Sequence, residues 1–154
     1  MHTSQTALKG RDSLKGGDIL QSDSDPIGEI RNRLKRWPQL PCETGDGWLS
    51  VHSEHGDGFS VSFAVTDGEY VVSFDGWHEH FTDVDDALKC FVFGLTDAAR
   101  LKVFSRGGVD YKWILEHREN GKWTEESTTG RLFFPFWGRR RVRCLQNRII
   151  DVQS

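Results

Sequence analysis

An Asp67-Gly68 pair separates two runs, 59–65 and 70–75, in which large apolar residues alternate with small or polar ones. This alternation is typical of β-strands that bury one face, and Asp-Gly is a favoured two-residue turn between hairpin strands. The turn therefore predicts how the two strands align. Three cross-strand pairs should lie on the apolar face: Val65 with Tyr70, Phe63 with Val72, and Val61 with Phe74.

A third strand, around Leu49 and Val51, should precede this hairpin and place both residues on the apolar face. We expect a three-residue loop, Gly56-Asp57-Gly58, because a two-residue loop would turn them outward. The predicted pairs are then Leu49 with Val65 and Val51 with Phe63. On the outer face, this register predicts rows of small and polar residues: His52, Ser62 and Ser73 in one row, Glu54, Ser60 and Asp75 in the next, and Ser50, Ala64 and Val71 on the other side, with Trp48 at the far end.

Helical patterns flank these strands. Apolar residues recur at helical spacing from Ile27 to Trp37, where Asp25 can cap a helix that Pro26 begins and Pro38 stops. Residues 38–46 should form a loop. A second helix should follow Thr82, its predicted cap, because acidic residues suit the first turn of a helix. Its buried stripe should contain Val84, Leu88, Phe91 and Leu95.

The remaining third of the chain should contain more strands. Strands are predicted from Leu101 and from Val109, and Asn120-Gly121 should turn the chain into a polar edge strand over 123–128. The aromatic run 132–137 contains Pro135, which restricts it to an edge strand or an extended segment. Val142, Leu145 and Ile149 suggest a short terminal helix.

These elements predict an α+β fold. We expect an antiparallel sheet of about six strands, in the order α-βββ-α-βββ-α, with the helices packed on one face. Residues 1–26 should be a disordered tail, because their scattered apolar positions cannot offset the entropy lost on ordering, and 27–154 should form a single domain. We expect a cytoplasmic protein with no membrane partner, since no stretch is apolar enough for a signal peptide or a membrane span. The three separated cysteines should be reduced.

Three strings resemble those of small bacterial proteins without an assigned activity. They are Gly76-Trp77-His78-Glu79-His80-Phe81, Phe93-Gly94-Leu95 and Phe133-Phe134-Pro135-Phe136-Trp137. The order of elements resembles that of type III secretion chaperones and their relatives. The second resemblance implies a fold and a binding role, and neither implies a catalytic site.

Charge is divided along the chain. Residues 38–88 contain eleven acidic residues and no lysine or arginine, whereas 89–150 contain thirteen basic and six acidic residues. The two segments could neutralise each other within the domain or across a dimer, or one of them could bind a partner. Neutralisation is the simpler interpretation.

The outer face of the predicted meander is the first candidate site. Small hydroxyl residues allow close approach to the backbone, so we expect a helix, a second subunit or a ligand to cover Ser62 and Ser73. A Ser, His and Asp on one face also allow a hydrolase, but no nucleophile elbow or oxyanion-hole motif is present.

Histidines and carboxylates of the acidic segment are the second candidate. His78 and His80 share a face if their segment is extended, so a divalent metal could bind His52, Asp75, His78 and His80. The spacing is wrong for a helical HExxH zinc site, and exposed loop histidines are the simpler interpretation. Trp77 should anchor its segment on the core.

Arg139, Arg140, Arg141 and Arg143 follow Phe136 and Trp137 and form the third candidate. Such a patch could bind a phosphate backbone while a ring stacks on a base. A nucleic-acid partner is nevertheless disfavoured, because the domain is acidic overall and a terminal helix could pair these arginines with the acidic segment.

We therefore expect a non-enzymatic binding or adaptor domain that holds a protein partner or its own homodimer mate and needs no cofactor. The alternatives are a metal-dependent hydrolase built on the histidine and aspartate cluster, and a nucleic-acid binder that uses the arginine cluster.

Overall fold

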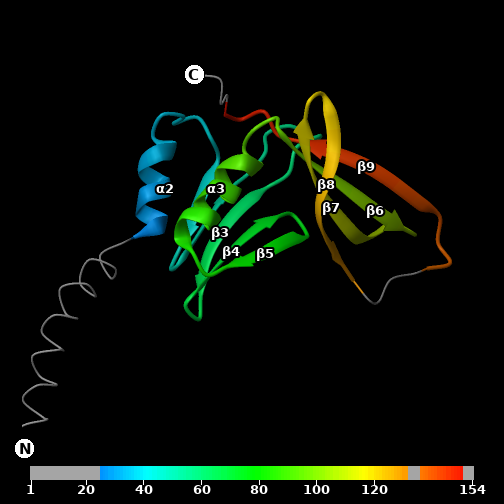
Figure 1. Ribbon diagram of the computed structural model, residues 1–154, viewed down its shortest axis with the longest axis horizontal. Coiled ribbons are helices and arrows are strands. Elements are labelled where there is room, and N and C mark those ends of the chain that lie inside the picture. Colours follow the sequence, from blue (N-terminus) through cyan, green and yellow to red (C-terminus); the bar gives the residue numbers. More distant parts are fainter. Residues whose placement is uncertain (1–24, 132–135, 151–154) are drawn as a thin grey trace, which may run out of the picture.

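The strands of the protein form two antiparallel sheets (Figure 1). The computed structural model describes residues 25–131 and 136–150. Sheet A has five strands in the order β1-β2-β3-β4-β5, and sheet B has four in the order β8-β7-β6-β9. The α+β class is confirmed, but the single sheet of about six strands is wrong. Sheet B strands are 7 to 11 residues long, whereas those of sheet A have 4 to 6. The longer strands pair with one another, which satisfies the hydrogen-bonding groups of their backbones.

Sheet A is a meander with short turns at most of its connections. Its strands are β1 (Cys42–Gly45), β2 (Trp48–Val51), β3 (Val61–Thr66), β4 (Glu69–Phe74) and β5 (Trp77–Phe81). The loop predicted over 38–46 is wrong at its end, because β1 pairs with β2 as an edge strand across the turn at Asp46-Gly47.

The β3–β4 hairpin has the predicted register. Val65 pairs with Tyr70, Phe63 with Val72 and Val61 with Phe74 across the turn, where Asp67 and Gly68 both have positive φ, as an Asp-Gly hairpin turn requires. Phe63 is fully buried, and Ser62 lies on the opposite face. The central prediction about side-chain orientation is confirmed.

The predicted register of β2 is wrong by two residues. Leu49 pairs with Phe63 and Val51 with Val61, because residues 52–60 form a longer connection than the expected three-residue loop. A shift of two residues preserves the face on which each side chain lies, so Leu49 and Val51 are buried as expected.

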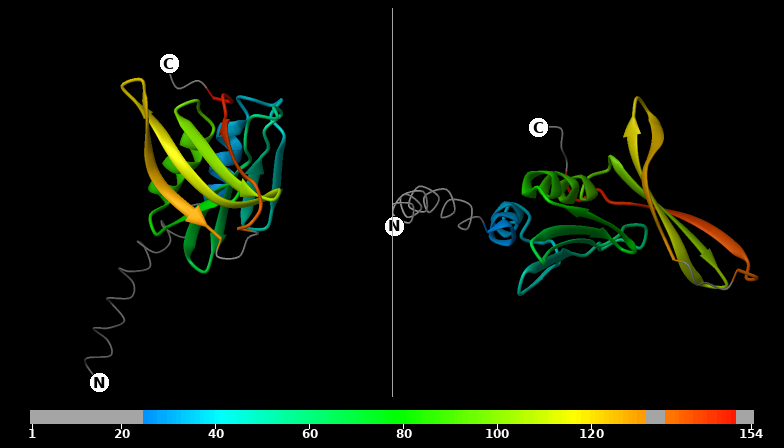
Figure 2. Two further views of the ribbon diagram at one scale, coloured as in Figure 1. Left: turned by 90° about the vertical axis from the view of Figure 1, so that its right-hand side faces the viewer. Right: turned by 60° about the horizontal axis from the view of Figure 1, so that its bottom comes forward.

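Two helices lie on the same side of sheet A (Figure 2). Helix α2 (Pro26–Leu34) begins as predicted: the Asp25 carboxylate accepts a hydrogen bond from Gly28 N–H at 3.0 Å. Helix α3 (Val84–Gly94) is capped by Asp83 and not by Thr82, because the Asp83 carboxylate accepts from Asp86 N–H at 3.1 Å. The buried stripe of α3 covers the apolar face of sheet A.

Sheet B contains β6 (Ala99–Arg106), β7 (Val109–Glu119), β8 (Lys122–Gly130) and β9 (Arg140–Gln146). β8 is an edge strand after the Asn120-Gly121 turn, as predicted. The predicted terminal helix is wrong: 140–146 form a strand that pairs with 100–106 of β6, so Val142 is half exposed and Leu145 lies opposite Leu101. The expected disordered tail lies outside the described residues for 1–24, as does 132–135 of the aromatic run.

Both sheets contribute to one apolar core. Trp77 of β5 is 1% exposed, stacks on Phe74 with ring centroids 4.7 Å apart, and donates a hydrogen bond to Ser127 of β8 at 2.9 Å. The prediction that Trp77 anchors its segment on the core is therefore confirmed. Trp77 is unable to serve as a binding residue because nothing outside the protein can reach its ring.

Candidate functional site

The outer face of sheet A carries two rows of small, polar and aromatic residues, which we call the serine face. Strand pairing aligns one residue from each strand in each row. One row contains Glu43, Ser50, Ser62, Ser73 and His78, and the other contains Gly45, Trp48, Ala64, Val71 and His80.

The serine face contains five of the predicted binding residues, in a different arrangement: Trp48, Ser62, Ser73, His78 and His80. Ser62 and Ser73 are neighbours as predicted, but Ser50 occupies the place expected for His52, because of the shifted register of β2. β5 then adds His78 and His80, whose rings are 5.8 Å apart on the same side of the strand. Their shared orientation agrees with the prediction for an extended segment.

Hydroxyl groups on the serine face bond to one another. Ser50 Oγ lies 2.9 Å from Ser62 Oγ, and Ser50 is only 7% exposed. Trp48, at 39% exposed, packs its indole ring across Gly45 of the neighbouring strand. The serine face therefore combines small hydroxyl groups with one partly exposed aromatic side chain.

Neither helix covers the serine face. α3 contacts the opposite face of sheet A through Phe91, whose ring meets that of Phe63 edge-on at 6.2 Å, and α2 lies beside α3 (Figure 2). Among residues 25–131 and 136–150, none forms a layer over the three serines. The interpretation in which a helix of the same chain covers this face is therefore wrong for the described residues.

The candidate metal ligands His52, Asp75 and His80 each interact with a different partner. His52 lies after β2, with Nε2 3.2 Å from a Glu43 carboxylate oxygen and Nδ1 3.3 Å from Ser60 Oγ, although the contact with Glu43 lacks hydrogen-bond geometry. His80 Nδ1 lies 2.9 Å from Glu69 Oε2. No group of three histidine, cysteine or carboxylate side chains within the described residues is placed to hold a metal ion.

Asp75 is in the turn between β4 and β5 and accepts a hydrogen bond from Ser60 N–H at 3.0 Å. Burial of the carboxyl group raises the pKa of Asp75, although the hydrogen bond from Ser60 and the charge of Arg143 act in the opposite direction. The residue as a whole is exposed in its turn. Asp75 lies outside the two rows of the serine face and within electrostatic reach of Arg143 and Asp110 of sheet B.

The arginine cluster lies at the start of β9 and not on a helix. Arg143 forms a bidentate ion pair with Asp110 at 2.8 and 2.7 Å, which raises its pKa further. Arg139, Arg140 and Arg141 are exposed, and no carboxylate of the described residues lies within ion-pair distance of them.

Ion pairs between the acidic and basic segments are rare among the described residues. Residues 42–81, which include all of sheet A, contain eight acidic residues and no lysine or arginine. In the part of the chain that the structure describes, only Lys89 with Asp86, on α3, forms an ion pair that joins the two segments. Within the described residues, ion pairs therefore provide almost none of the expected neutralisation of one segment by the other.

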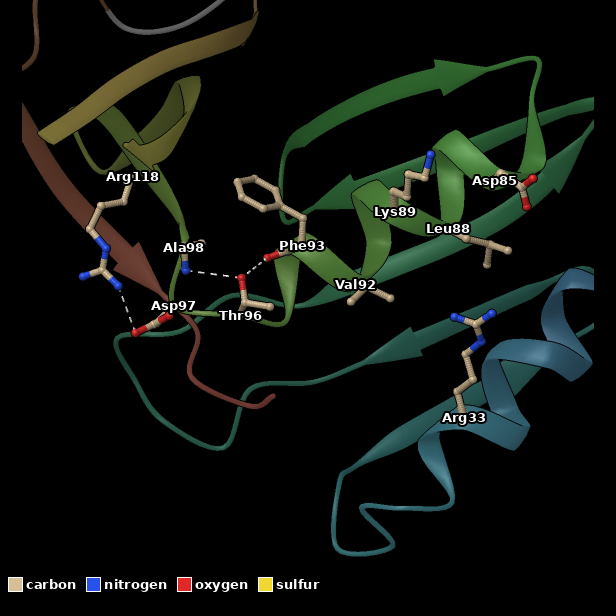
Figure 3. A pocket seen from close by; sticks show the side chains of 10 residues that line it. All are labelled: Arg33, Asp85, Leu88, Lys89, Val92, Phe93, Thr96, Asp97, Ala98 and Arg118. Atoms are coloured by element: carbon tan, nitrogen blue, oxygen red, sulfur yellow. Dashed lines mark hydrogen bonds and ion pairs between the residues drawn. The ribbon is translucent and has the colours of Figure 1, made fainter. Parts of the chain in front are cut away.

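A hollow of about 760 Å³ lies over the exposed side of α3 (Figure 3). The sequence patterns did not predict it. Its apolar floor is Leu88, Val92 and Phe93, and the arginines at its two ends are already paired, Arg33 with Glu29 at 2.6 Å and Arg118 with Asp97 at 3.0 Å. The signal that could have revealed it is the pair Val92-Phe93, two apolar residues of α3 outside the predicted buried stripe.

Neither described helix is long and apolar enough to cross a membrane. The resemblance of three strings to small bacterial proteins, and of the element order to secretion chaperones, stays a prediction. No family model, no curated protein and no solved structure matches this chain.

Proposed function

We propose that this protein is a non-enzymatic binding domain that holds a protein partner on the serine face of sheet A. The observation that carries the proposal is that Ser50, Ser62 and Ser73 form a row across three adjacent strands, over which no helix or strand of the described residues packs. An ordinary solvated sheet face carries long charged side chains and threonines, which keep other backbones away. Serines and Ala64 instead let a partner approach the backbone closely.

Charge favours a partner that presents cations to this face. Sheet A contains no lysine or arginine, and its outer face has Glu43 and Glu69 beside the histidines. Two copies of the face would bring together two acidic surfaces that contain no lysine or arginine, which is unfavourable. A different, basic partner avoids this repulsion, whereas a homodimer would have to offset it through contacts of the histidines.

The aromatic edge of the face supplies an anchor for such a partner. Trp48 is 39% exposed and has a flat apolar surface of the kind that is enriched at the centres of protein interfaces. Its ring is held in place by packing on Gly45, so little conformational entropy is lost when a partner covers it.

Substitution of Ser62 by arginine tests the proposal. Ser62→Arg places a long cation in the centre of the face, and Thr128→Arg places the same side chain on the exposed edge strand β8 as a control. Proteins that copurify with the wild-type chain should be lost with Ser62→Arg and with Val71→Arg, and retained with Thr128→Arg. Thermal unfolding of each variant shows that loss of binding is not loss of folding.

The same set of proteins retained by all three variants would overturn the proposal. Sedimentation velocity separates the two kinds of partner. A wild-type dimer that becomes a monomer only with the face variants would assign the face to a second copy of the chain, whereas a wild-type monomer leaves a different protein as the partner.

A further inference from the structure

Five cations meet at the end of sheet B that is farthest from the helices (Figure 1). Arg140, the first residue of β9, pairs directly with Arg106, the last residue of β6. Like charges placed directly opposite on adjacent strands destabilise a sheet. We call this end of the sheet, which comprises Arg106, Lys112, Trp137, Arg139, Arg140 and Arg141, the cationic tip.

No carboxylate of the described residues forms an ion pair with the cationic tip. Within the described residues, none of its arginines, nor Lys112, has an acidic group within ion-pair distance, whereas nearby Arg143 is fully paired with Asp110. Lys112 Nζ and the Arg140 guanidinium instead lie over the same Phe104 ring, 4.3 and 5.1 Å from its centroid. The ring attracts both cations but carries no negative charge, so the positive charge of this region stays unbalanced.

Backbone contacts hold the tip in shape. Arg106 Nη1 donates a hydrogen bond to Gly138 O at 3.2 Å, and Gly107 N–H donates to Arg139 O at 3.3 Å. Gly138 packs so closely on the backbone of Gly107 that a Cβ atom there would lie 2.5 Å from its nitrogen. The segment that leads into β9 is therefore fixed on the β6–β7 turn, and its cations keep defined positions.

Two exposed aromatic rings lie next to these charges. Phe136 is 70% exposed and Trp137 is 78% exposed, and their rings meet edge-on at 5.1 Å. An aromatic ring with this exposure adds almost nothing to the core, and hydrophobic burial would favour covering it.

We propose that the cationic tip binds single-stranded nucleic acid. Arginine matches phosphate with a planar pair of donors, and alternate side chains on an extended strand are spaced about 6.6 Å apart, so Arg139 and Arg141 can contact successive phosphates. An exposed indole such as that of Trp137 can stack on an unpaired base, which a duplex does not offer. A single strand can also follow β9 without coming near the carboxylates of sheet A. A broad anionic membrane surface would be less able to avoid those carboxylates.

Fluorescence anisotropy of a short, labelled oligouridylate with the full chain tests the proposal. Binding should weaken with salt, with a slope of log affinity against log salt of about −2 to −3 for three to four phosphate contacts. Trp137→Ala should weaken binding by about five- to a hundredfold through lost stacking, with unchanged thermal unfolding. Arg140→Gln should reduce the salt slope by about 0.7.

Arg148→Gln is the matched control, because Arg148 is exposed, lies after β9 and should leave affinity unchanged. Failure of the oligonucleotide to bind at low salt would overturn the proposal, as would equal loss of affinity with Arg148→Gln. Equal binding of a duplex of the same length, or preferential binding to phosphatidylserine vesicles, would also overturn it. So would salt-sensitive self-association that Arg140→Gln abolishes, because a second copy would then occupy the tip. These outcomes are independent of the serine face, which lies on the other sheet.

Discussion

The side-chain amide of Asn147 bonds to the backbone of Phe59, 88 residues earlier in the chain, in both directions. Asn147 Oδ1 accepts from Phe59 N–H at 3.0 Å, and Asn147 Nδ2 donates to Phe59 O at 2.9 Å and to Gly94 O at 2.9 Å. Asn147 is 2% exposed. One amide therefore joins the end of sheet B, the start of β3 and the end of α3.

Asn147→Ala should lower the free energy of unfolding by about 3 kcal/mol, because it leaves several buried backbone groups without partners. Urea unfolding at equilibrium measures this loss. Arg148→Ala, at the exposed next residue, should change stability by less than about 0.5 kcal/mol. Equal effects of the two substitutions would show that the amide does not join these elements.

Phe63→Ala should lower the free energy of unfolding by about 3 to 5 kcal/mol, since the ring is fully buried between sheet A and Phe91 of α3. Val65→Ala is the control on the same strand and face, because Val65 is 40% exposed and should lose little. Denaturant unfolding of both variants checks the expected difference. A loss below about 1 kcal/mol for Phe63→Ala would contradict the packing of α3 on this face.

Asp110→Asn should destabilise the protein near neutral pH and have little effect in acid. The hydrogen bonds from Arg143 hold the pKa of Asp110 below its ordinary value of 3.8. A lowered pKa in the folded state contributes stability that is present above the ordinary pKa and is lost as the pH falls through the lowered one. Urea unfolding from neutral to acidic pH should show the unfolding free energies of the wild type and the variant converging in acid.

Asp46→Asn, which removes an exposed carboxyl group from the β1–β2 turn, should show no such convergence. A deficit for Asp110→Asn that stays constant down to the lowest pH would contradict a role for its charge.

Cys90 should be the last of the three thiols to react with Ellman's reagent. Burial, with smaller effects from the charges of Glu79 and Glu126, raises the pKa of Cys90 to about 12, whereas Cys42 and Cys144 are exposed. The thiolate is the reacting species, so a higher pKa slows the reaction at mildly alkaline pH. Cys90→Ser should keep the fast phase and lose the slow one, and loss of the fast phase would contradict the assignment.

Local chemistry was enough to predict the β3–β4 hairpin and α2. Asp67-Gly68 specifies a turn, and Asp25 with Pro26 specifies a helix start, so neighbours in sequence determine each structure. The orientation of Ser62 and Ser73 followed from the same turn. The part of the serine face that lies on β3 and β4 was therefore predictable from the sequence.

Features that depend on distant residues were not predictable in this way. Val142, Leu145 and Ile149 fit a helical stripe, and only the ladder with β6 makes 140–146 a strand. The length of the 52–60 connection depends in part on Asn147, which holds Phe59 from the far end of the chain. Sheet B likewise depends on the pairing of β6 with β9, which are separated in the chain by two other strands.

A photo-crosslinking residue at Ala64, in the centre of the serine face, tests the proposed binding surface most directly. We predict a discrete crosslinked adduct in cells of the source organism, which disappears when Ser62→Arg is added and is not formed from the same probe at Thr128. Absence of any adduct from Ala64, or an adduct that Ser62→Arg leaves unchanged, would contradict the proposal that this face binds a protein.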